Sequence, residues 1–371
     1  MTREEYRAVV YDTVYLVSCA VKEAVPDKNR VESMNLPILY AIADGHLLTA
    51  AVAFALESAG VYDAAFTQAK AKAIRKVALM DAEMASIFAK MKNAGIWYMP
   101  LKGTVLKDYY PQFGMREMAD HDILFDASRA DDVKAIMIDM SYDAEHFGTG
   151  YHDCYYKEPV CNFEMHRALF GAGHDSTFQE YYSNVENRLV GDGYEKHFTP
   201  EDFYIYMLAH EYKHYSAGGT GLRSVLDTYV FLSKVSLNMD YVEAETEKLG
   251  INDFEKKNRS LAMHLFGGGE LTMAERKMLG YILSSGTYGT IIHSVENKMK
   301  KNGWGKIKYM LHRFSVPVSR KNNDYDIYAR AYPLFYKYKV LLPVLPFYRT
   351  IRSMWNGRFK AEANAIWKAK I

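Results

Sequence analysis

The sequence predicts an α+β protein, in which a mixed β-sheet with flanking helices is embedded between an N-terminal and a C-terminal helical region. Two patterns carry this prediction. Short apolar runs separated by turns follow one another between residues 96 and 166, which is typical of strands. Before and after this stretch, apolar residues recur at helical spacing. We therefore divide the chain into an N-terminal helical region (1–70), a sheet-bearing domain (71–198) and a C-terminal helical region with a basic tail (199–371).

The composition is that of a soluble globular protein with a large core. The chain has 371 residues, of which 49% are hydrophobic and 25% are charged, both ordinary values for this class. Its three cysteines, Cys19, Cys154 and Cys161, are odd in number and lack C-x-x-C spacing. This usage argues against a disulfide framework and for a reducing compartment. We expect a cytoplasmic protein.

The N-terminal part predicts helices over residues 4–25, 36–56 and 64–93. The second of these is the longest apolar stretch in the chain, but it contains Asp44 and His46. Charged and polar side chains at these positions favour a buried helix over a membrane span.

A strand is predicted at residues 96–101, immediately before the pair Lys102-Gly103. This pair predicts a turn that opens a short helix over residues 104–109. A glycine turn that leads into a helix offers backbone N–H groups to a phosphate.

Two later strands carry acidic side chains. Asp120 and Asp122 stand two positions apart before an apolar run, so both point to one face of the strand while His121 points to the other. A further apolar run, residues 160–166, carries Glu164. Three carboxylates on neighbouring strands form an oxygen-rich site that suits Mg²⁺.

The rest of the sheet-bearing domain and the C-terminal region follow the same two patterns. We expect a helix at residues 130–140 and strands at 142–146 and 151–157. Thr199 and Pro200 open the next helix as N-cap and first helical residue. Helices are expected over residues 200–215, 221–234, 239–248, 252–265, 272–283 and 291–300.

These motifs, taken in order, resemble the DNA polymerase β-like nucleotidyltransferase superfamily, which has a glycine turn, then Asp-x-Asp, then one more acidic residue on a later strand. The sequence also resembles the bacterial branch of uncharacterised nucleotidyltransferases within this superfamily. The motifs that carry this second resemblance are L-K-G, Y-P, R, D-x-D-I-L and F-E-M-H, followed downstream by H-x-x-x-H, G-L-R and L-D. The resemblance covers about residues 71–231. One departure is that the usual Gly-Ser of the turn is Lys102-Gly103 here.

The resemblance implies Mg²⁺-dependent transfer of a nucleoside monophosphate from ATP or another nucleoside triphosphate to a hydroxyl group. It implies that Asp120, Asp122 and Glu164 are catalytic and hold two Mg²⁺ ions. The residues it implies for nucleotide binding are Lys102, Gly103, Arg116, His210, His214 and Arg223. For Arg116, an ion pair with Asp122 or Asp126 is an equal alternative. The identity of the acceptor is not specified, and small molecules, sugars, proteins and RNA are all candidates. A module that binds nucleotide without turnover is a second class of function for this sequence.

A third possible class of function is suggested by residues His210 to His214. Their sequence, H-E-Y-K-H, matches the H-E-x-x-H signature of zinc hydrolases. Ala217 and Thr220 stand where the metzincin extension requires Gly and His. The nucleotidyltransferase resemblance instead implies a helical wall that faces the nucleotide, in which Asp227 orients Arg223. We rank a zinc metallohydrolase behind the first two classes.

The charges are unevenly distributed. Residues 296–371 contain 17 Lys or Arg and four acidic residues, a net charge of +13 in a chain whose total is +1. Such a tail can bind RNA, anionic lipid or an acidic partner, but the simplest expectation is that it packs against the acidic remainder of the chain. Pro333, Pro343 and Pro346 interrupt the apolar stretch at 331–348, which favours a packed or surface-lying segment over a transmembrane span.

Overall fold

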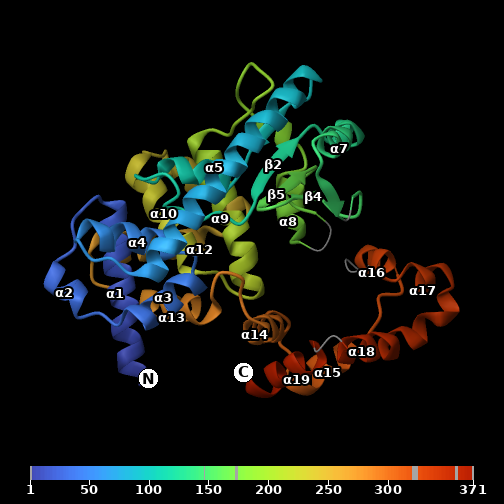
Figure 1. Cartoon of the computed structure of the whole chain (residues 1–371). Coiled ribbons are helices and arrows are strands. Elements are labelled where there is room, and N and C mark those ends of the chain that lie inside the picture. The colour runs from blue at the N-terminus through green and yellow to red at the C-terminus, as the bar shows by residue number, and fades with distance from the viewer. Residues whose placement is uncertain (1, 146, 172–173, 320–324, 356–357, 370–371) are drawn as a thin grey trace.

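The computed structural model of the chain describes residues 2–145, 147–171, 174–319, 325–355 and 358–369 (Figure 1). It confirms the predicted α+β class, with a five-stranded mixed sheet and many flanking helices. The boundaries placed at residues 70 and 198 stay a prediction.

The sheet has the strand order β1-β2-β5-β4-β3. Strands β2 and β5 are parallel, and the other neighbouring pairs are antiparallel. The strands are β1 (Tyr98–Pro100), β2 (His121–Phe125), β3 (Asp143–Glu145), β4 (His152–Lys157) and β5 (Cys161–His166). Each observed strand lies within or beside a segment that the sequence predicted as a strand. The predicted strand at 142–146 ends at His146, which lies outside the described residues.

One face of the sheet is apolar and covered by helices. Phe125 of β2 and Phe163 of β5 are buried in a core cluster with side chains of α5 (Ala64–Asn93) and α7 (Ala130–Asp139). Because side chains alternate along a strand, this packing turns the Asp122 side chain to the opposite face of the sheet. Helix α5 has the bounds that its apolar periodicity predicted.

The N-terminal region contains one more helix break than expected. The stretch predicted as a single helix is divided into α3 (Leu36–Gly45) and α4 (Thr49–Ser58). Leu47 between them has a φ of 54°. His46 is buried in this turn and accepts a hydrogen bond from the Leu222 amide at 3.2 Å, so a contact with a distant helix favours the break. The region also contains α1 (Arg3–Val21) and α2 (Lys28–Glu32).

The helices on the two sides of the sheet-bearing segment share one large apolar core. Leu16 of α1, Leu39 of α3 and Leu226 of α10 belong to the same buried cluster. Thr199 caps α9 as predicted, because its hydroxyl accepts a hydrogen bond from the Asp202 amide. The helices are α9 (Pro200–Ala217), α10 (Leu222–Lys234), α11 (Met239–Lys248), α12 (Asn252–Gly267), α13 (Met273–Ser285) and α14 (Ile291–Asn302).

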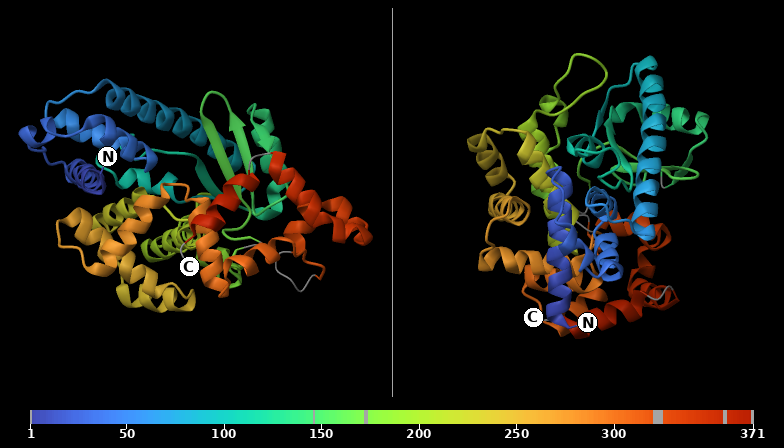
Figure 2. Two further views of the ribbon diagram at one scale, coloured as in Figure 1. Left: turned by 90° about the horizontal axis from the view of Figure 1, so that it is seen from below. Right: turned by 60° about the vertical axis from the view of Figure 1, so that its left-hand side comes forward.

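The last part of the chain forms an extended arm, drawn in red in Figures 1 and 2. At α16, Arg330 donates a hydrogen bond to the Thr149 carbonyl in the loop that precedes β4. Among the described residues, no helix is long and apolar enough to span a membrane. The arm consists of α15 (Lys306–Arg313), α16 (Tyr325–Ala331), α17 (Pro333–Lys337), α18 (Leu345–Trp355) and α19 (Arg358–Lys368).

Candidate active site

The turn after β1 places Lys102 beside the acidic strand. The Leu101 amide donates to the Asp122 carbonyl at 2.9 Å, and the Leu101 carbonyl accepts from the Thr104 amide at 3.0 Å. Lys102 has φ 46° and ψ −122°, the angles of the first central residue of a type II′ turn, where glycine is the usual residue. A side chain in this conformation costs about 1–3 kcal/mol. The turn therefore carries strain while it directs the lysine to the carboxylates.

Gly103 is required for a close approach by an arginine. A Cβ atom on this residue would collide with Nη1 of Arg116 and lie 3.0 Å from its Cζ. The helix that follows, α6 (Gly103–Leu106), is only four residues long and continues as a 3-10 turn over Lys107–Tyr109. The predicted short helix is thus present, and its glycine makes room for a guanidinium group.

Asp122 lies at the centre of the acidic face. Its Oδ1 atom accepts hydrogen bonds from Lys102 Nζ at 2.6 Å and from His166 Nε2 at 2.7 Å. Burial by itself would raise the pKa of Asp122, but Lys102 and His166 outweigh it and hold this pKa well below its usual range. Burial lowers the pKa of His166 to about 4. The imidazole is therefore neutral at pH 7 and donates its Nε2 proton to the carboxylate.

The other two carboxylates experience the charge of Asp122. Glu164 pairs with Asp122 in the parallel β2–β5 register, and Asp120 immediately precedes β2. Burial, with the negative charges of Asp122 and Asp120, raises the pKa of Glu164 to about 7. Burial and Asp122 also raise the pKa of Asp120. Ligand atoms of Asp122, Glu164 and His166 lie within 4.8 Å of one another, so the face is suited to a cation that relieves this repulsion.

Arg116 has a different partner from the two that the sequence suggested. Its Nε and Nη2 atoms bind Oδ1 and Oδ2 of Asp227 at 2.7 and 2.8 Å, and the Tyr110 hydroxyl donates to the same Oδ1 at 2.7 Å. The expected pairing with Asp122 or Asp126 is therefore wrong. Asp227 orients Arg116, where the resemblance had implied Arg223.

The carboxylates line a cavity of about 390 Å³ together with a helical wall whose cations are Lys213 and Arg223. His210, Lys213 and His214 of α9 and Arg223 of α10 line this wall. Burial lowers the pKa of both histidines of this wall, so these two side chains are neutral at pH 7. Arg223 donates to the Glu117 carbonyl at 2.8 Å, and no described carboxylate lies within 4.0 Å of its guanidinium. Burial, and next the charge of Lys102, lower the pKa of Lys213 to about 8. The cavity thus has an acidic side and a basic side, as a complex of metal and phosphate requires.

The zinc-hydrolase alternative lacks a ligand set. The Nε2 atoms of His210 and His214 lie 3.3 Å apart, but neither histidine belongs to a group of three metal-ligating side chains among the described residues. Glu211, which would be the general base, is buried and accepts a hydrogen bond from Asn258 Nδ2 at 3.0 Å. Burial raises the pKa of Glu211 to about 7. We do not carry this alternative further.

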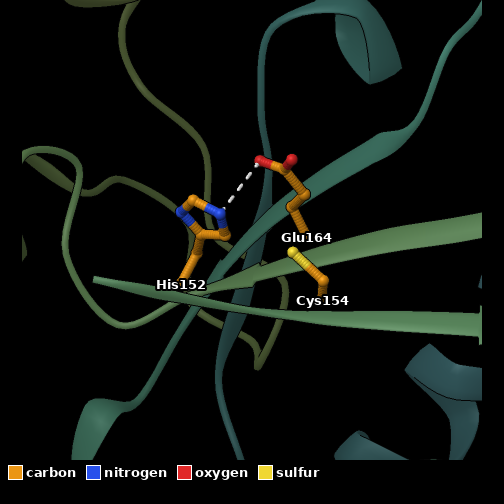
Figure 3. A group of neighbouring side chains, drawn as sticks. All are labelled: His152, Cys154 and Glu164. Carbon is orange, nitrogen blue, oxygen red and sulfur yellow. Dashed lines mark ion pairs between the residues drawn. The ribbon is translucent and has the colours of Figure 1, made fainter. Parts of the chain in front are cut away.

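Sequence reasoning missed two side chains beside Glu164, both on β4. His152 Nε2 lies 3.7 Å from Glu164 Oε2, and Cys154 pairs with Glu164 in the antiparallel β4–β5 register (Figure 3). Burial and then the Glu164 carboxylate raise the pKa of Cys154 to about 11, so this thiol is protonated. The strand at 151–157 was predicted, and its alternation puts residues 152 and 154 on one face. Only the pairing register reveals that this is the face of Glu164.

A wider groove of about 1110 Å³ lies beside the cavity, and Lys213 lines both. Among the residues that the structure describes, Asp175 is the one carboxylate that lines the groove, and it lies 3.9 Å from Lys301 Nζ. Tyr212, Tyr215 and Tyr281 contribute aromatic rings to its walls. The further lysines along the groove are Lys257, Lys277, Lys298, Lys300 and Lys301.

Comparison with known proteins identifies the family. A family model described as an uncharacterised nucleotidyltransferase matches residues 33–267, which include the sheet, the carboxylates and the helical wall. No curated protein and no solved structure matches the chain. The match covers more than half of the sequence and agrees with the resemblance inferred from its motifs. The chain therefore belongs to this family of uncharacterised nucleotidyltransferases.

Proposed function

We propose that this protein is a Mg²⁺-dependent nucleotidyltransferase, which transfers a nucleoside monophosphate from ATP or another nucleoside triphosphate to a hydroxyl acceptor. The observation that carries the proposal is the cavity with two chemically opposite sides. Asp120, Asp122 and Glu164 line one side, and Lys213 and Arg223 line the other. A triphosphate fits this arrangement because its charge is shared between metal ions and fixed cations.

The donor set fits Mg²⁺, since the acidic side offers carboxylate oxygens, the ligands that this ion prefers. Burial and the charges of Asp122 and Asp120 raise the pKa of Glu164, whereas Lys102 and His166 hold the pKa of Asp122 down. Two Mg²⁺ ions held by Asp120, Asp122 and Glu164 would stabilise charge on the attacking and the leaving oxygen. His166 keeps Asp122 in place through its 2.7 Å hydrogen bond.

Lys102 and Arg223 are the proposed phosphate ligands nearest to the carboxylates. Lys102 neutralises Asp122 in the free protein, and we infer that its ammonium group moves to a phosphate oxygen when nucleotide and metal enter. Arg223 keeps most of its guanidinium donors for the same ligand, because its assigned hydrogen bond uses Nη1 alone. Arg116, held by Asp227, adds fixed positive charge at the edge of the cavity.

The transfer itself follows from these positions. The acceptor oxygen forms a bond to the α-phosphorus, the bond between the α-phosphorus and its bridging oxygen breaks, and pyrophosphate leaves. The proton of the acceptor hydroxyl passes to Glu164, a carboxylate that lines the cavity and acts as general base. The lysine-lined groove beside the cavity is the proposed acceptor side, and its charge favours a negatively charged acceptor.

The proposal is tested by pyrophosphate release. The purified chain is incubated with Mg²⁺, each of the four nucleoside triphosphates and a panel of hydroxyl acceptors, alongside Asp122→Ala and the exposed control Asp143→Asn. We expect pyrophosphate from the wild type and the control but not from Asp122→Ala, with unchanged circular dichroism. Tight nucleotide binding without pyrophosphate would identify a binding module, and unchanged turnover in Asp122→Ala would refute the site.

A further inference from the structure

The C-terminal arm carries more than half of the exposed large hydrophobic side chains among the described residues. Of the 29 large hydrophobic side chains that are exposed among the described residues, 17 lie between Ile307 and Trp367. Trp355 is 90% exposed and Trp367 is 83% exposed. Soluble proteins scatter such residues singly, and their concentration in one segment marks an interaction surface.

The arm also keeps its positive charge. Among the described residues, the Lys301–Asp175 pair is the one ion pair that joins the segment after residue 296 to the earlier chain, and its atoms are 3.9 Å apart. The expectation that the basic tail packs against the acidic remainder of the chain is thus supported by a single ion pair among the described residues. Basic side chains of the segment that have no carboxylate within 4.0 Å among the described residues, such as Lys308 and Arg352, are available to a partner.

The apolar side chains of α15 lie on one side of the helix. Ile307, Leu311 and Phe314 are 71%, 68% and 50% exposed. They follow each other at four and three positions, the spacing that aligns side chains along one face. Tyr309, on the other side of the same helix, is buried against α14 and α19.

Helix α18 repeats this pattern and extends the same surface. Phe347, Ile351, Met354 and Trp355 are all more than half exposed and are spaced for one helical face. The rings of Phe314 and Phe347 lie 6.4 Å apart, which joins this face to that of α15. Figure 1 shows both helices in the red arm. We call the seven residues from Ile307 to Trp355 named in this and the preceding paragraph the α15–α18 face.

Basic side chains accompany the α15–α18 face on its own two helices and on α19. Lys308, Arg352 and Lys360 have no carboxylate within 4.0 Å among the described residues, whereas Arg313 is paired with Glu362 at 2.6 Å. An apolar face bordered by free cations and carrying an exposed tryptophan matches the requirements of a helix that lies at a membrane surface.

We propose that the α15–α18 face binds the surface of an anionic lipid bilayer. Its apolar side chains enter the boundary between headgroups and acyl chains, and the surrounding lysines and arginines bind lipid phosphates. A second copy of this chain is a poorer occupant, because two segments of +13 would repel each other. This inference is separate from the proposed transfer reaction.

The test is flotation of the full chain with vesicles of equal parts phosphatidylglycerol and phosphatidylcholine, and with vesicles of phosphatidylcholine alone. We expect binding to the anionic vesicles only, weakened by high salt. The double variant Ile351→Ser/Trp355→Ser should reduce the partition coefficient by about tenfold or more, and Arg352→Glu/Lys360→Glu should do the same. The matched control Val25→Ser/Tyr62→Ser, which removes equally exposed apolar side chains from the body, should bind as the wild type does.

Two results would overturn this inference. One is the absence of wild-type binding to the anionic vesicles. The other is binding that survives both arm variants. Size-exclusion chromatography of the same proteins checks the alternative occupant: a dimer in the wild type that Ile351→Ser/Trp355→Ser converts to a monomer would assign the face to self-association. All these readouts are independent of catalytic activity.

Discussion

Lys102 Nζ lies 2.6 Å from Oδ1 of Asp122, so the chain supplies its own cation to the carboxylate at the centre of the candidate site. The backbone of Lys102 is held at φ 46° to make this contact. If the proposed function holds, a lysine in this position would compete with a metal ion for Asp122 when nucleotide is absent and would be available to a phosphate when nucleotide is present.

Lys102→Met separates these two effects. Without the ammonium group, Mn²⁺ should bind the nucleotide-free protein more tightly, because Asp122 is no longer neutralised. Turnover of triphosphate should fall by about 10- to 100-fold, because a phosphate contact is lost. Metal titration and pyrophosphate release measure the two quantities, with exposed Lys92→Met as the control. Weaker metal binding in Lys102→Met would show that the lysine does not compete.

Gly103→Ala tests the close approach of Arg116. The added Cβ atom collides with Nη1 of the guanidinium, which two hydrogen bonds hold to Asp227. We expect a loss of about 1–3 kcal/mol in the free energy of unfolding, measured by urea titration. Gly280→Ala is the matched control, because a Cβ there meets no atom within 4 Å and lies in helix α13. A Gly103→Ala protein as stable as the wild type would mean that Arg116 adapts freely.

Asp227→Ala should be among the most destabilising single changes in the cavity wall. It leaves the Arg116 guanidinium buried without its carboxylate, and it removes the acceptor of the Tyr110 hydroxyl. Breaking a buried ion pair costs about 3–5 kcal/mol. The exposed pair of Arg129 and Asp132 provides the comparison, since Asp132→Ala should cost less than about 1 kcal/mol. Similar costs for both variants in urea unfolding would contradict the structural role of Asp227.

Glu211 makes stability depend on pH. Its pKa is raised from 4.5 to about 7 in the folded chain, so the folded state binds more protons than the unfolded state between these values. Stability contributed by this group therefore falls as pH rises through that window. Glu211→Gln should match the wild type near pH 4.5 and exceed it by on the order of 3 kcal/mol above pH 7. Exposed Glu180→Gln should follow the wild type at each pH, and a Glu211→Gln curve parallel to the wild type would refute the assignment.

The acidic strands were predictable because the relevant information is local. Alternation along a strand predicted one face for Asp120 and Asp122, and both line the cavity although Asp120 lies just before β2. The periodicity of residues 64–93 predicted helix α5 to its observed ends. The pairing of Arg116 with Asp227 joins residues 111 positions apart, and no local pattern distinguishes Asp227 from Asp122 as the partner. His152 likewise becomes a neighbour of Glu164 only through the β4–β5 register.

The central claim is that Asp120, Asp122 and Glu164 form a metal-dependent nucleotide site, and a thermal-shift titration tests it most directly. The melting temperature is measured with each of the four nucleoside triphosphates, with and without Mg²⁺, for the wild type, Asp120→Asn and the control Asp143→Asn. A ligand that binds only the folded state raises this temperature. We predict a Mg²⁺-dependent rise with at least one triphosphate in the wild type and the control, and none in Asp120→Asn. No rise with any triphosphate, or a rise that persists in Asp120→Asn, would contradict the account.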